Sequence, residues 1–187
     1  MKKSIFVVFS LLFVTQINGQ TPVNLHVFES LTGVASTFIS ANFFQGDRIP
    51  SVSLELPGDY KVLSAAFRKN LTDNGITLVS ENAAAVITLK NAAVTYSAPF
   101  TKNFLGDYFT ERTAFISGDM GSSETKFRFE AVDTVKLSDV KELENRGLPF
   151  TMSDIPKEPF WGSITNIAIA AGATVLAVVL FFTVRTN

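Results

Sequence analysis

Few side chains in this sequence can do chemistry. There is a single histidine, His26, and there is no cysteine. One histidine without cysteine builds a zinc site only if carboxylates supply most of the ligands. The lack of thiols also excludes disulfides, thiolate metal sites and a cysteine nucleophile. We therefore expect His26 to be a solvated or packing residue, and we predict neither a metal ion nor a cofactor.

Paired carboxylates are the remaining route to acid–base chemistry. Four carboxylates lie near the ends of predicted strands: Glu81, Asp107, Glu111 and Asp119. We expect them to be polar positions in turns or on the wet side of a sheet. The sequence also lacks a nucleophile elbow, a glycine-rich phosphate loop and a zinc-protease motif. It therefore predicts a protein that is not an enzyme.

The overall charge argues against one class of partner. The net charge is −1, and the lysines and arginines are dispersed along the chain. A protein that binds nucleic acid needs a basic patch to neutralise phosphates. We therefore expect no nucleic-acid partner.

The N-terminus has the pattern of a secretory signal peptide. A basic start at Lys2 and Lys3 precedes the apolar stretch Ile5–Val14, and the small residue Gly19 follows near a plausible cleavage point. We predict a signal peptide over residues 1–19 and an exported domain over residues 20–148. An uncleaved signal would give a two-span protein with the same outward domain. The short basic start and the cysteine-free exported domain favour a bacterial protein with its domain in the periplasm.

A second apolar stretch, Phe160–Val184, carries no charge and ends at Arg185. As a helix it would extend about 37 Å, against about 30 Å of bilayer hydrocarbon. We therefore predict a single-pass inner-membrane protein with a transmembrane helix over residues 160–184 and a cytoplasmic tail over residues 185–187. Phe160 and Trp161 would fix its depth at the outer interface. Ala168 and Gly172 lie four apart, a spacing of small residues that allows two such helices to associate as a homodimer.

The exported domain combines helical and strand patterns. Apolar residues recur every three or four positions in Val27–Phe44 and Asp59–Asn74, which indicates two amphipathic helices. Alternation is strict in Ser51–Leu56 and clean over Lys126–Ala131. The pattern predicts strands over the following ranges: Ser51–Leu56, Ile76–Ser80, Ala85–Tyr96, Thr110–Asp119 and Lys126–Leu137. The predicted fold class is an α+β two-layer sandwich, in which two helices cover a mostly antiparallel sheet of about four to five strands. The proline-containing segment 149–159 is predicted to be an extended spacer.

One predicted connection is neither short nor polar, as hairpin connections usually are. Residues 99–109 join two long strands and contain five large apolar side chains: Phe100, Phe104, Leu105, Tyr108 and Phe109. The segment either folds back over the sheet and buries these side chains, or offers an apolar contact surface to a partner protein or lipid. These five residues are the candidate partner-binding residues.

A helix that ends at Asn74 and Gly75 is followed by the apolar strands Ile76–Val79 and Ala84–Leu89. This succession resembles small periplasmic accessory domains, such as those of lipopolysaccharide-transport and secretion-accessory lipoproteins. The chain departs from those lipoproteins because it has no cysteine to carry a lipid. Since likeness of fold does not carry function by itself, the resemblance implies an architecture and no activity.

These features predict a non-enzymatic, membrane-tethered periplasmic domain that binds a component of a cell-envelope assembly or transport system, either an envelope protein or a lipid. The alternative is a lipid or small-ligand binding module with a cavity between helices and sheet, lined by some of the 18 phenylalanines. A carboxylate-dependent hydrolase acting on envelope polysaccharide is the less favoured third hypothesis.

Reporter fusions test the predicted topology. A reporter enzyme that is active only in the periplasm should be active when fused after Asp154 and silent when fused after Asn187, because the span between them should return the chain to the cytoplasm. Enzyme activity in intact cells is the measurement. Activity at Asn187 would contradict the topology.

Overall fold

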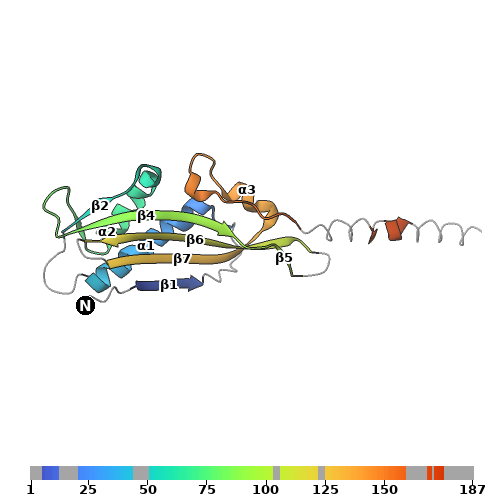
Figure 1. Cartoon of the computed structure of the whole chain (residues 1–187), viewed down its shortest axis with the longest axis horizontal. Coiled ribbons are helices and arrows are strands. Elements are labelled where there is room, and N and C mark those ends of the chain that lie inside the picture. The colour runs from blue at the N-terminus through green and yellow to red at the C-terminus, as the bar shows by residue number, and fades with distance from the viewer. Residues whose placement is uncertain are drawn as a thin grey trace, which may run out of the picture.

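The computed structural model describes residues 6–12, 21–43, 51–102, 106–121, 125–158, 168–169 and 171–174. The described elements, with η for a 3₁₀ helix, are β1 (Phe6–Leu12), α1 (Asn24–Phe43), β2 (Ser51–Glu55), η1 (Gly58–Leu63), α2 (Ser64–Asp73), β3 (Thr77–Leu78), β4 (Ala85–Tyr96), β5 (Phe100–Thr101), β6 (Tyr108–Met120), β7 (Thr125–Lys136), η2 (Leu137–Asp139), α3 (Val140–Leu143) and η3 (Pro149–Thr151). They form a sheet layer and a helix layer, with α1 running behind the long strands in Figure 1.

The sheet is mixed. Its strand order is β1-β7-β6-β4-β2-β3, and β5 pairs with β6 beyond this path. The long strand β6 is antiparallel to both of its long neighbours, β4 and β7. The outer pairings are parallel: β2 with β3 and with β4, and β1 with β7. The α+β class is confirmed. The prediction of a mostly antiparallel sheet of four to five strands is correct for the centre only, because the chain passes through α2 between β2 and β3, and such a crossover returns it in the same direction.

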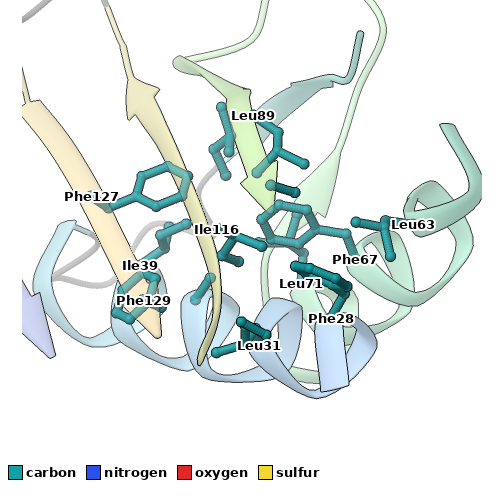
Figure 2. Close-up of a cluster of buried hydrophobic side chains, with 14 of the residues drawn as sticks. Phe28, Leu31, Ile39, Leu63, Phe67, Leu71, Leu89, Ile116, Phe127 and Phe129 are labelled. Carbon is teal, nitrogen blue, oxygen red and sulfur yellow. The ribbon is translucent and has the colours of Figure 1, made fainter. Parts of the chain in front are cut away.

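One face of the sheet is buried by the helices. In β6 the buried side is formed by every second residue: Thr110, Arg112, Ala114, Ile116, Gly118 and Met120. Helix α1 buries Phe28, Leu31, Ala35 and Ile39, at the spacing that a helix needs to keep one face inward. Figure 2 shows Ile116 and Phe129 of the sheet lying against Leu31 and Ile39 of α1. The core therefore lies between α1, α2 and the three long strands.

A β-bulge in β4 changes which residues face this core. The register with β6 shifts between Leu89 and Asn91, so that Lys90 has no paired residue. Leu89 is buried before the bulge, and Ala92 and Val94 are buried after it. Because an extra residue reverses the alternation, the even-numbered positions face the helices from there to the end of the strand.

For the second predicted helix, Asp59–Asn74, the sequence predicts a cap by Asp59 at the start and a left-handed cap at Gly75 after the end. Gly75 has φ of +79°, and the amide of Ile76 donates to the carbonyl of Leu71 at 3.0 Å, which is the left-handed cap expected from the sequence. Asp59 does not cap the start. The segment opens as the 3₁₀ helix η1 and continues as α2, and neither has a side-chain cap.

The predicted terminal segments are described only in part. Residues 6–12 of the predicted signal peptide form β1, which pairs with β7. The predicted spacer 149–159 begins inside the packed domain, since Phe150 and Thr151 are buried. Most of the predicted span 160–184 lies outside the described residues. Within the part of the chain that the structure describes, no helix has the length and apolar character needed to cross a membrane.

Gly118 gives a direct test of how closely the strands and core pack. A Cβ atom at this position would collide with the backbone oxygen of Thr88 and would lie 2.6 Å from Cζ of Phe127. We expect Gly118→Ala to lower the free energy of unfolding by about 2 kcal/mol, the usual cost of overpacking. Gly58→Ala is the control, because nothing lies within 4 Å of its Cβ position. Equal unfolding free energies for the two variants, measured by denaturant titration, would contradict this packing.

Candidate partner-binding surface

Strand β5 and the start of β6 extend the sheet beyond the end of β4 (Figure 1), and we call residues 100–102 and 107–109 the sheet tip. Phe100 pairs with Phe109, and Thr101 pairs with Tyr108. The ring centroids of Phe100 and Phe109 are 6.3 Å apart, and the ammonium group of Lys102 lies 4.7 Å from the Phe109 centroid. The sheet tip is therefore an antiparallel extension of β6 with its aromatic rings on a strand framework.

The predicted contact residues differ in exposure. Phe100 keeps 40% of its surface exposed, whereas Tyr108 and Phe109 are half-buried. Tyr108 packs against a small cluster that we call the tip cluster: Val135, Leu137, Val140 and Leu143. Phe104 and Leu105 lie outside the described residues. Of the five predicted contact residues, Phe100 therefore offers the most accessible apolar surface among those described.

Polar contacts hold the base of the sheet tip. The Thr110 hydroxyl donates to the carbonyl of Ser97 at 2.8 Å, and the Glu111 amide donates to the Ser97 hydroxyl at 3.0 Å. The ammonium of Lys136 is 2.7 Å from the carboxylate of Asp107. Its hydrogen bond with Asp107, and then the attraction of that charge, raise the pKa of Lys136 above its ordinary value. These contacts fix the direction in which the tip leaves the sheet.

The four carboxylates considered as acid–base candidates do not form a common site. Asp107 pairs with Lys136, while Asp119 lies at the opposite end of β6 and pairs with Lys90 at 3.5 Å. Glu111 is exposed on β6, and Glu81 is exposed before β4. Over the described residues no group of acidic or histidine side chains is arranged to hold a metal ion.

The predicted membrane residues are described only in part. Ala168 and Gly172 are exposed residues in short helical stretches, and nothing lies within 4 Å of a Cβ built on Gly172. Phe160 and Trp161 lie outside the described residues. Helix association and interfacial anchoring therefore stay predictions.

The most constrained polar group of the described chain is Arg112, which is fully buried. Its Nε and Nη2 donate to the two carboxylate oxygens of Asp133, at 2.8 and 2.5 Å. Its Nη1 donates to the carbonyl of Pro22 at 2.8 Å and to the side-chain oxygen of Asn24 at 2.7 Å. A two-pronged arginine–carboxylate pair is among the stronger hydrogen-bonded arrangements in proteins. Arg112 therefore joins β6 to β7 and to the start of α1.

Asn24 extends this network in the other direction. Its side-chain amide donates to the Tyr96 hydroxyl at 2.8 Å and to the carbonyl of Thr151 at 2.7 Å. Burial raises the pKa of Tyr96 above its ordinary value, and the hydrogen bond from Asn24 acts in the opposite sense. The phenol is therefore neutral at physiological pH. Strands β4, β6 and β7, helix α1 and the segment η3 meet at these few side chains.

The sequence interpretation missed Arg112, although the alternation of its strand contains the signal. In Thr110–Asp119 the even positions include Ala114 and Ile116, which mark the inward face. Arg112 has the same parity, so the pattern places a charged residue in the core. A buried charge requires a partner. That partner, Asp133, directly faces Arg112 in the neighbouring strand.

A small cavity of about 140 Å³ lies between α1 and β7. Its lining includes Val27 and Leu31 from the helix and Ala131 and Val132 from the strand. His26 also borders it, and the Nδ1 atom of His26 is 2.8 Å from a carboxylate oxygen of Glu29. The His26 side chain is exposed, which agrees with the expectation that it is solvated.

Comparisons with known proteins give little. No protein-family model and no curated protein matches this chain. A solved minor lipoprotein from Acinetobacter baumannii is 17% identical with a TM-score of 0.40, covering 49% of this chain and 69% of its own. The rare lipoprotein B from Shewanella oneidensis is 16% identical with a TM-score of 0.37, covering 68% and 86%. Likenesses at these TM-scores carry no argument about this chain.

Replacing Arg112 tests whether the network stabilises the domain. Arg112→Met should lower the free energy of unfolding by about 3–5 kcal/mol, because it leaves Asp133 and Asn24 without their buried partner. Arg112→Lys should also lower the free energy of unfolding, since lysine lacks the planar guanidinium group that donates to both carboxylate oxygens of Asp133. The control is Lys69→Met, which removes the exposed pair with Asp73 and should cost less than about 1 kcal/mol. Denaturant unfolding that gave the same cost for Arg112→Met and Lys69→Met would contradict the role of Arg112.

Proposed function

We propose that this chain is a non-enzymatic, membrane-tethered domain on the periplasmic side of the bacterial inner membrane, and that its sheet tip binds a component of a cell-envelope assembly or transport system. The observation that carries the proposal is the position of Phe100. A large aromatic side chain stands exposed on a paired strand that extends beyond the domain core. Exposed aromatic anchors on a fixed framework are typical of protein-binding surfaces.

The framework supports a binding role because the tip need not become ordered on contact. Phe100 is held by backbone pairing with Phe109, and the base of the tip is held by Ser97 and Thr110. A surface that is already ordered loses less conformational entropy when a partner binds. The alternative, a tip whose only role is to cover the core, leaves the exposed ring of Phe100 unexplained.

The predicted tether supports the same assignment. Ile155 packs against the tip cluster, which also contacts Tyr108. Figure 1 shows β5 and α3 at the same end of the sheet. Only four residues lie between Ile155 and the start of the predicted span at Phe160. The five residue steps that join the two positions reach about 17 Å when the chain is extended. A span over residues 160–184 would therefore hold the sheet tip near the membrane, where an envelope component would meet it.

The alternative of a small-ligand module has one observation in its favour, the cavity between α1 and β7. Its volume of about 140 Å³ lies below the roughly 300 Å³ at which small-molecule sites begin. The cavity is too small to enclose a lipid or a cofactor. The partner-binding proposal is therefore the better supported of the two.

Photo-crosslinking from the tip tests the proposal. A photoreactive phenylalanine analogue at position 100, in the full chain in native membranes, should capture an envelope assembly or transport component. The control is the same analogue at Val62, which is similarly exposed at 42% but lies on η1. Identical adducts at the two positions, read by mass spectrometry, would contradict the assignment of the tip. Phe100→Ser should abolish a partner interaction while changing the unfolding free energy by less than about 1 kcal/mol, as for other surface substitutions.

A further inference from the structure

We propose that residues 152–155, at the start of the predicted tether, form a strap whose docking against the domain orders the sheet tip, so that the tether regulates the partner-binding surface. This regulation rests on the proposed function, since the surface that it controls is the sheet tip. Its physical basis is the tip cluster, to which both the tip and the strap contribute a side chain.

The tip cluster is separate from the main core between the helices and the sheet. Among the described residues its buried part consists of four side chains, and the partly buried side chains that pack against it are Tyr96 from β4, Tyr108 from the tip and Ile155 from the strap. In so small a cluster each of these side chains covers a large share of the apolar surface. Withdrawal of Ile155 would therefore expose the cluster that supports Tyr108.

The strap is held by weaker means than the strands. Its residues alternate between the domain and solvent, since Ser153 and Ile155 are half-buried while Met152 and Asp154 are exposed. The amide of Ser153 donates to a carboxylate oxygen of Glu144 at 3.0 Å. The strap belongs to neither a helix nor a strand. A segment with few buried apolar contacts and no ladder of backbone hydrogen bonds detaches at a lower free energy than the sheet.

Docking of the strap also sets the length of chain that is free to reach the membrane. With Ile155 docked, the chain to the start of the predicted span at Phe160 reaches about 17 Å when extended. With the strap detached back to the buried Thr151, nine residue steps lead to Phe160, and the reach rises to about 31 Å. A larger separation between the domain and the span therefore requires that Ile155 leave the cluster.

The two states of the strap differ at the sheet tip. In the docked state Ile155 covers the cluster against which Tyr108 packs, and in the detached state Tyr108 loses part of this support. A partner that binds the ordered tip must strengthen the docking of the strap by the same factor by which docking strengthens its binding. Binding at the tip is thereby coupled to the distance between the domain and the membrane.

Hydrogen exchange in the full chain, purified in detergent, tests the role of the strap. We expect Ile155→Ser to raise the exchange rates of the amides of residues 108–111 at least tenfold, and to leave those of residues 114–118, in the centre of the same strand, within twofold. Met152→Ser is the matched control, because Met152 lies in the strap with 40% of its surface exposed and should affect neither segment. Ile155→Val should keep the rates within twofold of the parent, because it retains an apolar side chain against the cluster.

Glu144→Ala is an independent variant, because it removes the hydrogen bond to Ser153 and leaves the side chains of the cluster unchanged. It should raise exchange in residues 108–111 at least threefold. Unchanged exchange there in both variants would overturn the proposal, and so would an equal rise in residues 108–111 and 114–118, which a general loss of stability produces. A parent chain that gives no crosslink from position 100 would instead contradict the proposed function, and the exchange rates would still decide the role of the strap.

Discussion

The guanidinium of Arg112 is buried beneath the sheet, where an unpaired charge would cost several kcal/mol of desolvation. It is tolerated because its hydrogen-bonding groups point toward four acceptor atoms, on Asp133, Pro22 and Asn24. Two of these acceptors belong to the segment that starts α1. The helix layer is thereby fixed to the sheet in one position, since a displaced α1 would leave the guanidinium of Arg112 without two of its hydrogen-bond acceptors. Apolar packing alone would tolerate such a displacement more easily, because it has no preferred direction.

Asn24 connects the hydrogen bonds of Arg112 to the end of the domain. This side chain both accepts from Arg112 and donates to Tyr96 and Thr151, so its orientation is fully determined. Thr151 in turn accepts from the amide of Asn145 at 3.0 Å. The sheet tip leaves the fold just beyond Tyr96, and the predicted tether leaves just beyond Thr151. Both exits therefore lie beside residues that this network holds in place. Among the described residues no buried polar side-chain atom lacks a partner, which is what such a network requires.

The sequence predicts the helices and long strands of this fold because their apolar residues recur with the right period, as in Ala85–Tyr96 and Thr110–Asp119. Periodicity carries no information on strand direction, so the parallel pairing of β2 was missed although a helix separates it from β3. Composition singles out Phe100 and Tyr108 alike as candidate contact residues, and that role stays a prediction. Their difference in exposure could not be predicted, because the tip cluster that packs against Tyr108 consists of residues from 135 to 143, distant in sequence from the tip. The pairing of Arg112 with Asp133 could not be predicted either, because it depends on the register between β6 and β7.

The bulge at Lys90 shows that the length of β4 matters as much as its composition. Without that extra residue, Ala92 and Val94 would turn toward solvent, and Tyr96 would turn away from Asn24. Most exposed loops absorb an inserted or deleted residue at little cost, because only the loop must adjust. Here a deletion at a solvent-exposed lysine would exchange the two faces of half a strand. Relatives of this domain should therefore differ in the length of their connections while keeping the number of residues in β4 constant.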